Sequence, residues 1–364
     1  MLATKVSCGS TGSVVVVVGV VVVGVVVVGV RVVVVVDVVV DTDATSSVLS
    51  VPQADARSNT ATSALVSRRN FGIAVTDIPH IVEIIGIFSH SVDTPPLPSI
   101  PVELTEIADG ILVALRPSTG FGSPNMAAVI EDDGITVVDS GTVPRLGREF
   151  ADALAPTGVP IRHLVYTSPH IDHVGGSTAF PLAAVYGTPE TSALLDQPPN
   201  VEAYSHMAPE LANDFLGLTT RPVTHTVREA AWISARVVIA PSHGQVAENL
   251  VVQIPDANVV LAGAMATFGV IPPAWGGNPS PWADQLDVIL GWGTTIVPSH
   301  GPVGGENEVR ELQQYLRSLL APGEGPWDRW ANQRFHVANI ERAAMLAAGD
   351  PAPPPSILAL MGIS

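Results

Sequence analysis

One stretch of this chain concentrates residue types that bind metal ions: His163-Leu-Val-Tyr-Thr-Ser-Pro-His170-Ile-Asp172-His173-Val-Gly-Gly176. Its first residues, 163–166, form an apolar run that is typical of a buried strand. Two imidazoles and a carboxylate then follow within four residues. Neutral imidazole nitrogen and carboxylate oxygen are ordinary zinc ligands, and a loop leaving a strand can direct several of them at one point. The stretch therefore predicts a metal site at the end of a strand.

Two more histidines stand in the same kind of setting further along the chain. They are His243, in Ile239-Ala-Pro-Ser-His243-Gly-Gln, and His300, in Ile296-Val-Pro-Ser-His300-Gly-Pro. Each follows a short apolar run and precedes a glycine, which allows the loop to turn tightly. A single histidine in such a loop can equally be a hydrogen-bonded structural residue. The recurrence at three strand ends is what favours ligands.

At these residues the chain resembles the metallo-β-lactamase superfamily of metal-dependent hydrolases, over roughly residues 105–320. That family carries a His-x-His-x-Asp-His motif after a strand, a later His, a bridging Asp in a Gly-Asp pair, and a final Gly-His-Gly. Residues 126–130 and 135–141 are similar to its opening strands, and residues 248–263 to the paired strands after its third metal histidine. The resemblance implies an α/β fold, a four-layer α-β-β-α sandwich.

The resemblance also implies a set of metal ligands: His170, Asp172, His173, His243 and His300. It gives His170 and His243 to a first metal site and the other three to a second. The chain departs from the family at two positions, because Ser168 stands where the first motif histidine is expected and Ala264 where the bridging aspartate is expected. Serine is a poor zinc ligand and alanine is none, so a complete two-metal centre is not expected.

The predicted function is that of a metal-dependent hydrolase with a mononuclear site. Three protein ligands and a water suffice for a catalytic zinc, which supplies metal-bound hydroxide at neutral pH. Asp172 is the predicted catalytic residue, because its carboxylate can also handle the proton. The predicted cofactor is one zinc ion rather than two, with iron or manganese as alternatives. Asp139, after the opening strands, is expected to orient loop backbone or a ligand imidazole.

Two alternatives remain open at this point. Ser168 and Ala264 also suit a catalytically decayed protein that keeps the fold as a binding or structural module. Imidazole and carboxylate ligands would further suit an iron-dependent oxygenase of the same fold. The bond predicted to be hydrolysed is an ester, lactone, thioester, amide or related bond.

Composition limits the partners. Charged residues are 14% of the 364-residue chain, hydrophobic residues are 47%, and the net charge is -17. Nucleic acid and anionic membranes would therefore be repelled. The expected partner is a small-molecule substrate, with an apolar part if the loop aromatics Phe268, Trp275 and Trp282 line its pocket. The single cysteine, Cys8, excludes an intrachain disulfide. The oligomeric state is left undecided.

The first hundred residues differ from the rest. Residues 14–40 contain 22 valines, and the Pro-rich segment 93–101 is typical of an extended linker. We therefore predict a leader and linker over 1–101, outside the fold, a metallo-β-lactamase-like domain over 102–322, and a helical extension over 323–364. A membrane contact is expected only through the leader. Ser67-Arg-Arg-Asn-Phe71 resembles a twin-arginine export signal, so the predicted location is cytoplasmic or exported.

Between residues 102 and 322, β-branched runs alternate with helical stretches. The predicted strands are 111–115, 127–131, 135–138, 163–166, 183–186, 237–240, 250–254, 259–261 and 294–297. The predicted helices are 143–154, one that starts at 188, 281–290, 306–320 and 327–348, with 351–355 extended. The aromatic side chains Phe268, Trp275 and Trp282 are expected either to line an apolar pocket over the metal face or to pack in the core.

Overall fold

The structure is a computed structural model that describes residues 20–28, 31–38, 102–116, 122–321 and 323–363. The chain divides into two compact units, Met1–Ser91 and Val92–Ser364. All of the predicted metal ligands lie in the second unit, which also contains the C-terminal extension. The predicted domain limits at residues 101 and 322 stay predictions.

The described part of the first unit is a valine-rich antiparallel pair of strands, β1 (Val20–Val28) and β2 (Arg31–Val38). Valine branches at Cβ, which restricts its side chain in a helix and suits the pleated surface of a strand. No helix in the described ranges is both long enough and apolar enough to cross a bilayer. The twin-arginine-like segment lies outside the described residues.

The first sheet of the second unit holds its strands side by side in sequence order. They are β3 (Thr105–Ala108), β4 (Ile111–Ala114), β5 (Met126–Glu131), β6 (Gly134–Val138), β7 (Ile161–Val165), β8 (Ala184–Gly187) and β9 (His225–Thr226). Pairing is antiparallel from β3 to β6 and parallel from β6 to β9. The carboxyl ends of β6 and β7 therefore meet at one edge of this sheet.

The second sheet also follows sequence order. Its strands are β10 (Ala231–Trp232), β11 (Val238–Ser242), β12 (Asn249–Ile254), β13 (Val259–Thr267) and β14 (Thr295–His300). The last pair, β13 and β14, is parallel, and the others are antiparallel. Every residue of β13 is buried, as expected for a strand covered on both faces. β14 ends at His300, one of the predicted ligands.

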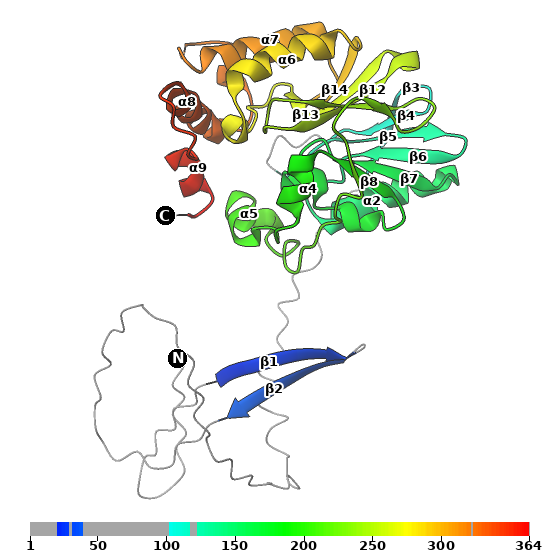
Figure 1. Ribbon diagram of the computed structural model, residues 1–364, viewed down its shortest axis with the longest axis vertical. Coiled ribbons are helices and arrows are strands. Elements are labelled where there is room, and N and C mark those ends of the chain that lie inside the picture. Colours follow the sequence, from blue (N-terminus) through cyan, green and yellow to red (C-terminus); the bar gives the residue numbers. More distant parts are fainter. Residues whose placement is uncertain (1–19, 29–30, 39–101, 117–121, 322, 364) are drawn as a thin grey trace, which may run out of the picture. The chain divides into compact units, whose positions relative to one another are not determined.

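The helices lie outside the two sheets (Figure 1). They are α2 (Pro144–Leu154), α3 (Ile171–Val174), α4 (Pro189–Leu195), α5 (Val201–Met207), α6 (Pro279–Leu290), α7 (Glu306–Ser318), α8 (Arg334–Ala347) and α9 (Pro355–Leu360). As the sequence predicts, Pro144 stands in the first turn of α2. The hydroxyl of Thr188 caps α4 by accepting from the backbone N–H of Thr191.

Three clusters of buried side chains separate four layers. One cluster joins the facing sheets, for example Val129 of β5 and Val252 of β12. A second packs Phe150 of α2 against the first sheet, and a third packs Leu286 of α6 and Leu312 of α7 against the second sheet. The fold is therefore the α-β-β-α sandwich that the sequence predicts, with α6 and α7 on the side away from α2 (Figure 1).

The C-terminal extension differs from its prediction in two places. The helix predicted over 327–348 is wrong at its start, because α8 begins only at Arg334. Asn332 has a left-handed backbone (φ 59°) that interrupts a helix, and the Gln333 amide donates to two carbonyl oxygens of the preceding turn. The extended tail is also shorter than predicted, because α9 begins at Pro355, whose ring suits a first helical turn.

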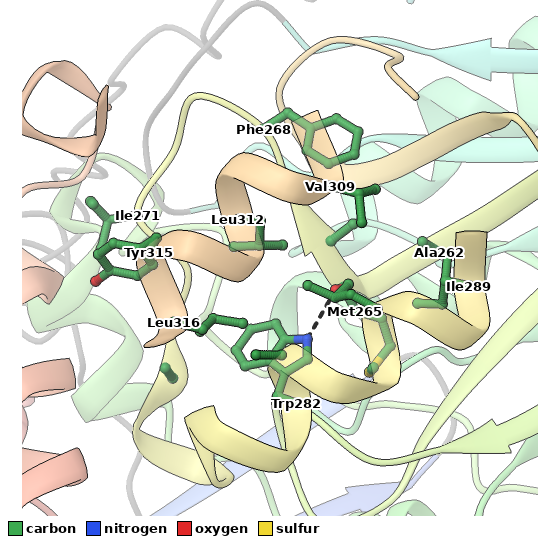
Figure 2. Close-up of a cluster of buried hydrophobic side chains, with 14 of the residues drawn as sticks. Ala262, Met265, Phe268, Ile271, Trp282, Ile289, Val309, Leu312, Tyr315 and Leu316 are labelled. Carbon is green, nitrogen blue, oxygen red and sulfur yellow. Dashed lines mark hydrogen bonds between the residues drawn. The ribbon is translucent and has the colours of Figure 1, made fainter. Parts of the chain in front are cut away.

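The aromatic residues of the segment 265–282, from the end of β13 to the start of α6, belong mainly to the core. Phe268 and Trp282 are buried in the cluster between β13, α6 and α7, and the indole N–H of Trp282 donates to the carbonyl oxygen of Met265 at 3.1 Å (Figure 2). Trp275 is partly buried and meets Phe335 edge-on, with 4.8 Å between ring centroids. An aromatic pocket lined by Phe268 and Trp282 is therefore wrong, and the packing alternative holds for both.

Candidate metal centre

The motif residues lie where β7 ends and the chain turns into the single turn of α3. Gly175 and Gly176 close this turn against the loop that follows β6. A Cβ atom at Gly175 would collide with the carbonyl oxygen of Thr142, and one at Gly176 with that of Ser140. Glycine is therefore required at both positions for α3 to sit against that loop. This contact fixes the position of α3, and with it of Asp172 and His173, relative to the loop after β6.

Asp172 joins ligands from the two sheets. Its Oδ2 atom lies 3.1 Å from Nε2 of His300, which is 128 residues further along the chain, and 3.6 Å from Nε2 of His173. All three side chains are buried. The structure thus brings together the three residues that the sequence assigns to the second metal site.

Asp139 holds His173 in place from the opposite side. One carboxylate oxygen accepts from the backbone N–H of Thr167 at 2.9 Å. The other lies 2.8 Å from Nδ1 of His173 and accepts from the Thr167 hydroxyl at 2.7 Å. Asp139 has a left-handed backbone (φ 61°), which is uncommon outside glycine, and is buried. The carboxylate therefore fixes the ring so that Nε2 faces Asp172, as carboxylates do for histidine ligands of metals.

Charge and burial act in opposite directions on these groups. Burial alone would lower the pKa of His173, but the carboxylates of Asp139 and Asp172 outweigh it and raise that pKa to about 9. Burial alone would raise the pKa of Asp172, yet the surrounding imidazoles, first of all that of His173, hold it well below its usual range. A metal ion binding here would have to displace the proton from His173, because metal ligands bind deprotonated.

Replacing Asp139 with asparagine is expected to weaken metal binding by about 10–100-fold. Asparagine keeps the size of the side chain, but it loses the charge that orients the His173 ring and fixes which ring nitrogen carries the proton. Competitive titration of zinc against a chelator measures the change. The exposed Asp132, replaced in the same way, is the matched control and should bind zinc as the unchanged protein does. Equal affinities in the two variants would contradict the positioning role of Asp139.

The two ligands assigned to the first metal site are placed differently. His170 is half-buried at the start of α3, and burial, opposed by the charge of Asp172, lowers its pKa to about 4. His243 is exposed, and its Nδ1 lies 2.6 Å from the carbonyl oxygen of Ala247. A carbonyl only accepts, so Nδ1 carries the proton and Nε2 of the neutral ring has the free lone pair. In the described ranges His243 makes no hydrogen bond to the other predicted ligands.

The positions that depart from the family are filled by other contacts. The buried hydroxyl of Ser168 donates to Oε1 of Gln245 at 2.7 Å and accepts from the N–H of His170 at 3.3 Å. The N–H of Ala264 donates to the hydroxyl of Thr167 at 3.1 Å. The sequence reasoning did not single out Gln245 or Thr167, and the polar contacts of both cross between loops that are distant in the chain. A neutral hydrogen-bonded pair, Ser168 with Gln245, thus stands where the family places the first motif histidine.

Within the described ranges, no group of three or more His, Cys, Asp or Glu side chains is already arranged to hold a metal ion. The separations around Asp172 can nevertheless be compared with those of a metal site. Two ligand atoms that are each about 2.0–2.2 Å from one tetrahedral ion lie about 3.3–3.6 Å apart, and the separations of 3.1 and 3.6 Å from Asp172 are close to this. Among the described residues, the buried polar side-chain atoms without a partner include three of this cluster: Asp172 Oδ1, His173 Nε2 and His300 Nδ1. Only His173 Nε2 among these atoms faces Asp172 Oδ2, and since buried polar atoms are rarely left unpaired, its free position fits a metal ion held there.

The model of the metallo-beta-lactamase superfamily matches residues 119–311, more than half of the chain. The chain belongs to the metallo-beta-lactamase superfamily. The resemblance noted from the motif residues is therefore confirmed, and membership of this superfamily points to a metal-dependent hydrolase.

Solved structures of metallo-beta-lactamases are similar to this chain. The FIM-1 enzyme of Pseudomonas aeruginosa in its mono-zinc form is 20% identical, with 61% of this chain and 98% of that chain covered and a TM-score of 0.49. For the enzyme of Erythrobacter litoralis the identity is 19%, the covered shares are 61% and 99%, and the TM-score is 0.48. The enzyme of Hirschia baltica is 20% identical, with 59% of this chain and 97% of that chain covered and a TM-score of 0.45. No curated protein sequence matches the chain.

Proposed function

We propose that this protein is a metal-dependent hydrolase that works with one metal ion, held by Asp172, His173 and His300. The observation that carries the proposal is the meeting of these three buried side chains at Oδ2 of Asp172, where Nε2 of His173 has no hydrogen-bond partner. An ester, lactone, thioester, amide or related bond is the proposed point of cleavage, and zinc is the proposed ion, with iron or manganese as alternatives.

The chemistry that a divalent ion supplies in such a site is Lewis acidity, which lets water act as a nucleophile near neutral pH. The protein residues position the reactants. Asp139 orients the His173 ring, and His300 holds one oxygen of Asp172. The other oxygen, Oδ1, is left to accept a hydrogen bond from a water. Asp172 would therefore orient that water through Oδ1 while Oδ2 stays beside His300 and His173.

A single ion is proposed because the first site lacks donors. The Ser168 hydroxyl already donates to Gln245 and accepts from His170, and Ala264 offers no side-chain donor. His170 and His243 alone are fewer than the three protein ligands that a catalytic zinc uses. His170 instead lies at the edge of the site, where it can bind substrate or a proton.

Metal analysis of the purified full chain, combined with assays on esters, lactones, amides and phosphodiesters, tests the function. We expect close to one zinc, iron or manganese ion per chain and hydrolysis of at least one substrate class. Only traces of metal together with no hydrolysis across the panel would remove the proposal.

The double variant Ser168→His with Ala264→Asp separates an adapted enzyme from a decayed one. We expect unchanged or reduced activity, because a histidine at the fully buried position 168 must displace Gln245 and crowd its surroundings. Metal content and the rate of hydrolysis are the two measurements, with each single variant as a control. A large gain from near-zero activity would instead favour the second candidate function, a decayed member of the superfamily that acts as a binding module.

A further inference from the structure

A cavity of about 300 Å³ opens beside the candidate metal centre. One wall is formed by His170, Ile171 and Val174, at the start of and within α3. The facing wall comes from α4, α5 and the segment between them, including Leu194, Leu195 and Tyr204. Because α3 also carries Asp172 and His173, the cavity and the metal centre share one structural element.

Tyr204 links the cavity to the metal centre electrostatically. Burial, together with the negative charge of Asp172, raises the pKa of Tyr204 to about 12, so its hydroxyl stays protonated. In the described part of the chain this hydroxyl makes no hydrogen bond, although the ring packs against Phe215 at 5.9 Å. A free phenol donor near the carboxylate of Asp172 can bind a polar atom of a ligand that extends from the cavity toward the metal centre.

The rest of the lining is mainly apolar. Leu194, Leu195, Pro198 and Pro199 provide aliphatic surface, and the Asn200 side chain is used to cap α5. Leu194 is 50% exposed, so its side chain reaches solvent at the rim of the cavity. A mainly apolar lining with a few polar groups at one end is typical of a small-molecule site.

We propose that this cavity binds the apolar part of the substrate, so that the substrate is an ester, lactone, thioester or amide with a hydrophobic group next to the bond that is cleaved. This rests on the proposed hydrolase function. At roughly 30 Å³ for each atom of the size of water, the cavity holds about ten non-hydrogen atoms. A medium-length aliphatic chain or a single aromatic ring has that size, and it can belong either to the acyl group or to the leaving group.

Two series of esters test the proposal and show whether the bound hydrophobic group belongs to the acyl group or to the leaving group. In one the acyl chain grows from acetate to decanoate with p-nitrophenol as leaving group, and in the other acetate is esterified with alcohols from ethanol to decanol. We expect kcat/KM to rise by up to about fourfold for each methylene in one series and to level off once the cavity is full. The series that shows the rise identifies the group bound.

Leu194→Trp fills the cavity from an exposed position and is expected to abolish the dependence on chain length. Gln197→Trp, at another exposed part of the rim, should act in the same way. The control is Leu182→Trp, because Leu182 is 92% exposed and lines a different cavity beside α2. A chain-length dependence that persists in both rim variants would overturn the proposal. So would an unchanged protein that hydrolyses esters without any chain-length dependence in either ester series.

Calorimetric titration of the full chain with octanol tests the cavity without catalysis. Binding that is lost in Leu194→Trp and kept in Leu182→Trp supports the cavity even if no ester is hydrolysed, in which case only the hydrolase function fails. Hydrolysis without octanol binding and without chain-length dependence leaves the hydrolase function standing and removes the cavity proposal.

Discussion

Replacing Asp172 with asparagine is expected to abolish metal retention and to lower hydrolysis by about 10³-fold or more. Asp172 is the residue that contacts both other ligands of the proposed site, His300 at 3.1 Å and His173 at 3.6 Å. Asparagine has the same shape, so its amide oxygen can still accept from His300, but it is neutral and a much weaker metal ligand. Replacing a residue that only positions a metal ligand typically lowers metal affinity by about 10–100-fold. Replacing Asp172, which is itself a proposed ligand, should therefore lower it by more than about 100-fold.

Mass spectrometry of bound zinc after dialysis and the rate on the best ester measure the two effects. The matched control is Asp284→Asn, because that carboxylate is 73% exposed and paired with Arg317 on the outer helices. It should keep full metal content and activity. If Asp172→Asn also kept both, the ion would have to be held elsewhere, and the assignment of Asp172, His173 and His300 would be wrong.

Much of the second unit could be predicted from local sequence patterns. The strands β5, β6, β7, β11, β12 and β14 lie within two or three residues of their predicted limits, because β-branched runs end at glycine, proline or polar residues. The start of α8 could not be predicted, since it depends on the backbone of Asn332 and on hydrogen bonds from Gln333. The short helix α5 was missed because its seven residues carry no strong apolar periodicity.

The candidate site shows the same division. Residue types and strand ends indicate a metal site, and the superfamily resemblance groups Asp172, His173 and His300, which the structure brings into contact. The pairing of Ser168 with Gln245 could not be predicted, because it crosses 77 residues between two loops whose closeness depends on the packing of the sheets. Tyr204 was missed for the same reason, since no local motif distinguishes a tyrosine that faces a cavity from one that packs in a core.

Trp282 is the largest fully buried side chain in the layer of α6 and α7. Besides its packing, its indole N–H satisfies the carbonyl oxygen of Met265 at 3.1 Å (Figure 2). The ring also lies against the loop of the candidate site, because a Cβ atom at Gly244 would come within 2.6 Å of it. Gly244 stands directly before Gln245, so Trp282 supports the loop whose amide holds Ser168.

Replacing Trp282 with alanine is therefore expected to lower the free energy of unfolding by about 3–5 kcal/mol. Trp282→Phe keeps most of the packing but leaves the Met265 carbonyl unpaired, so about 1–3 kcal/mol is expected for that variant. Denaturant titration followed by circular dichroism measures both. Trp232→Ala is the control, because Trp232 is 61% exposed on the edge strand β10, and it should change stability by no more than about 0.5 kcal/mol. A similar small loss in Trp282→Ala would mean that α6 does not pack on β13 through this ring, and that the loop carrying Gln245 is supported by other contacts.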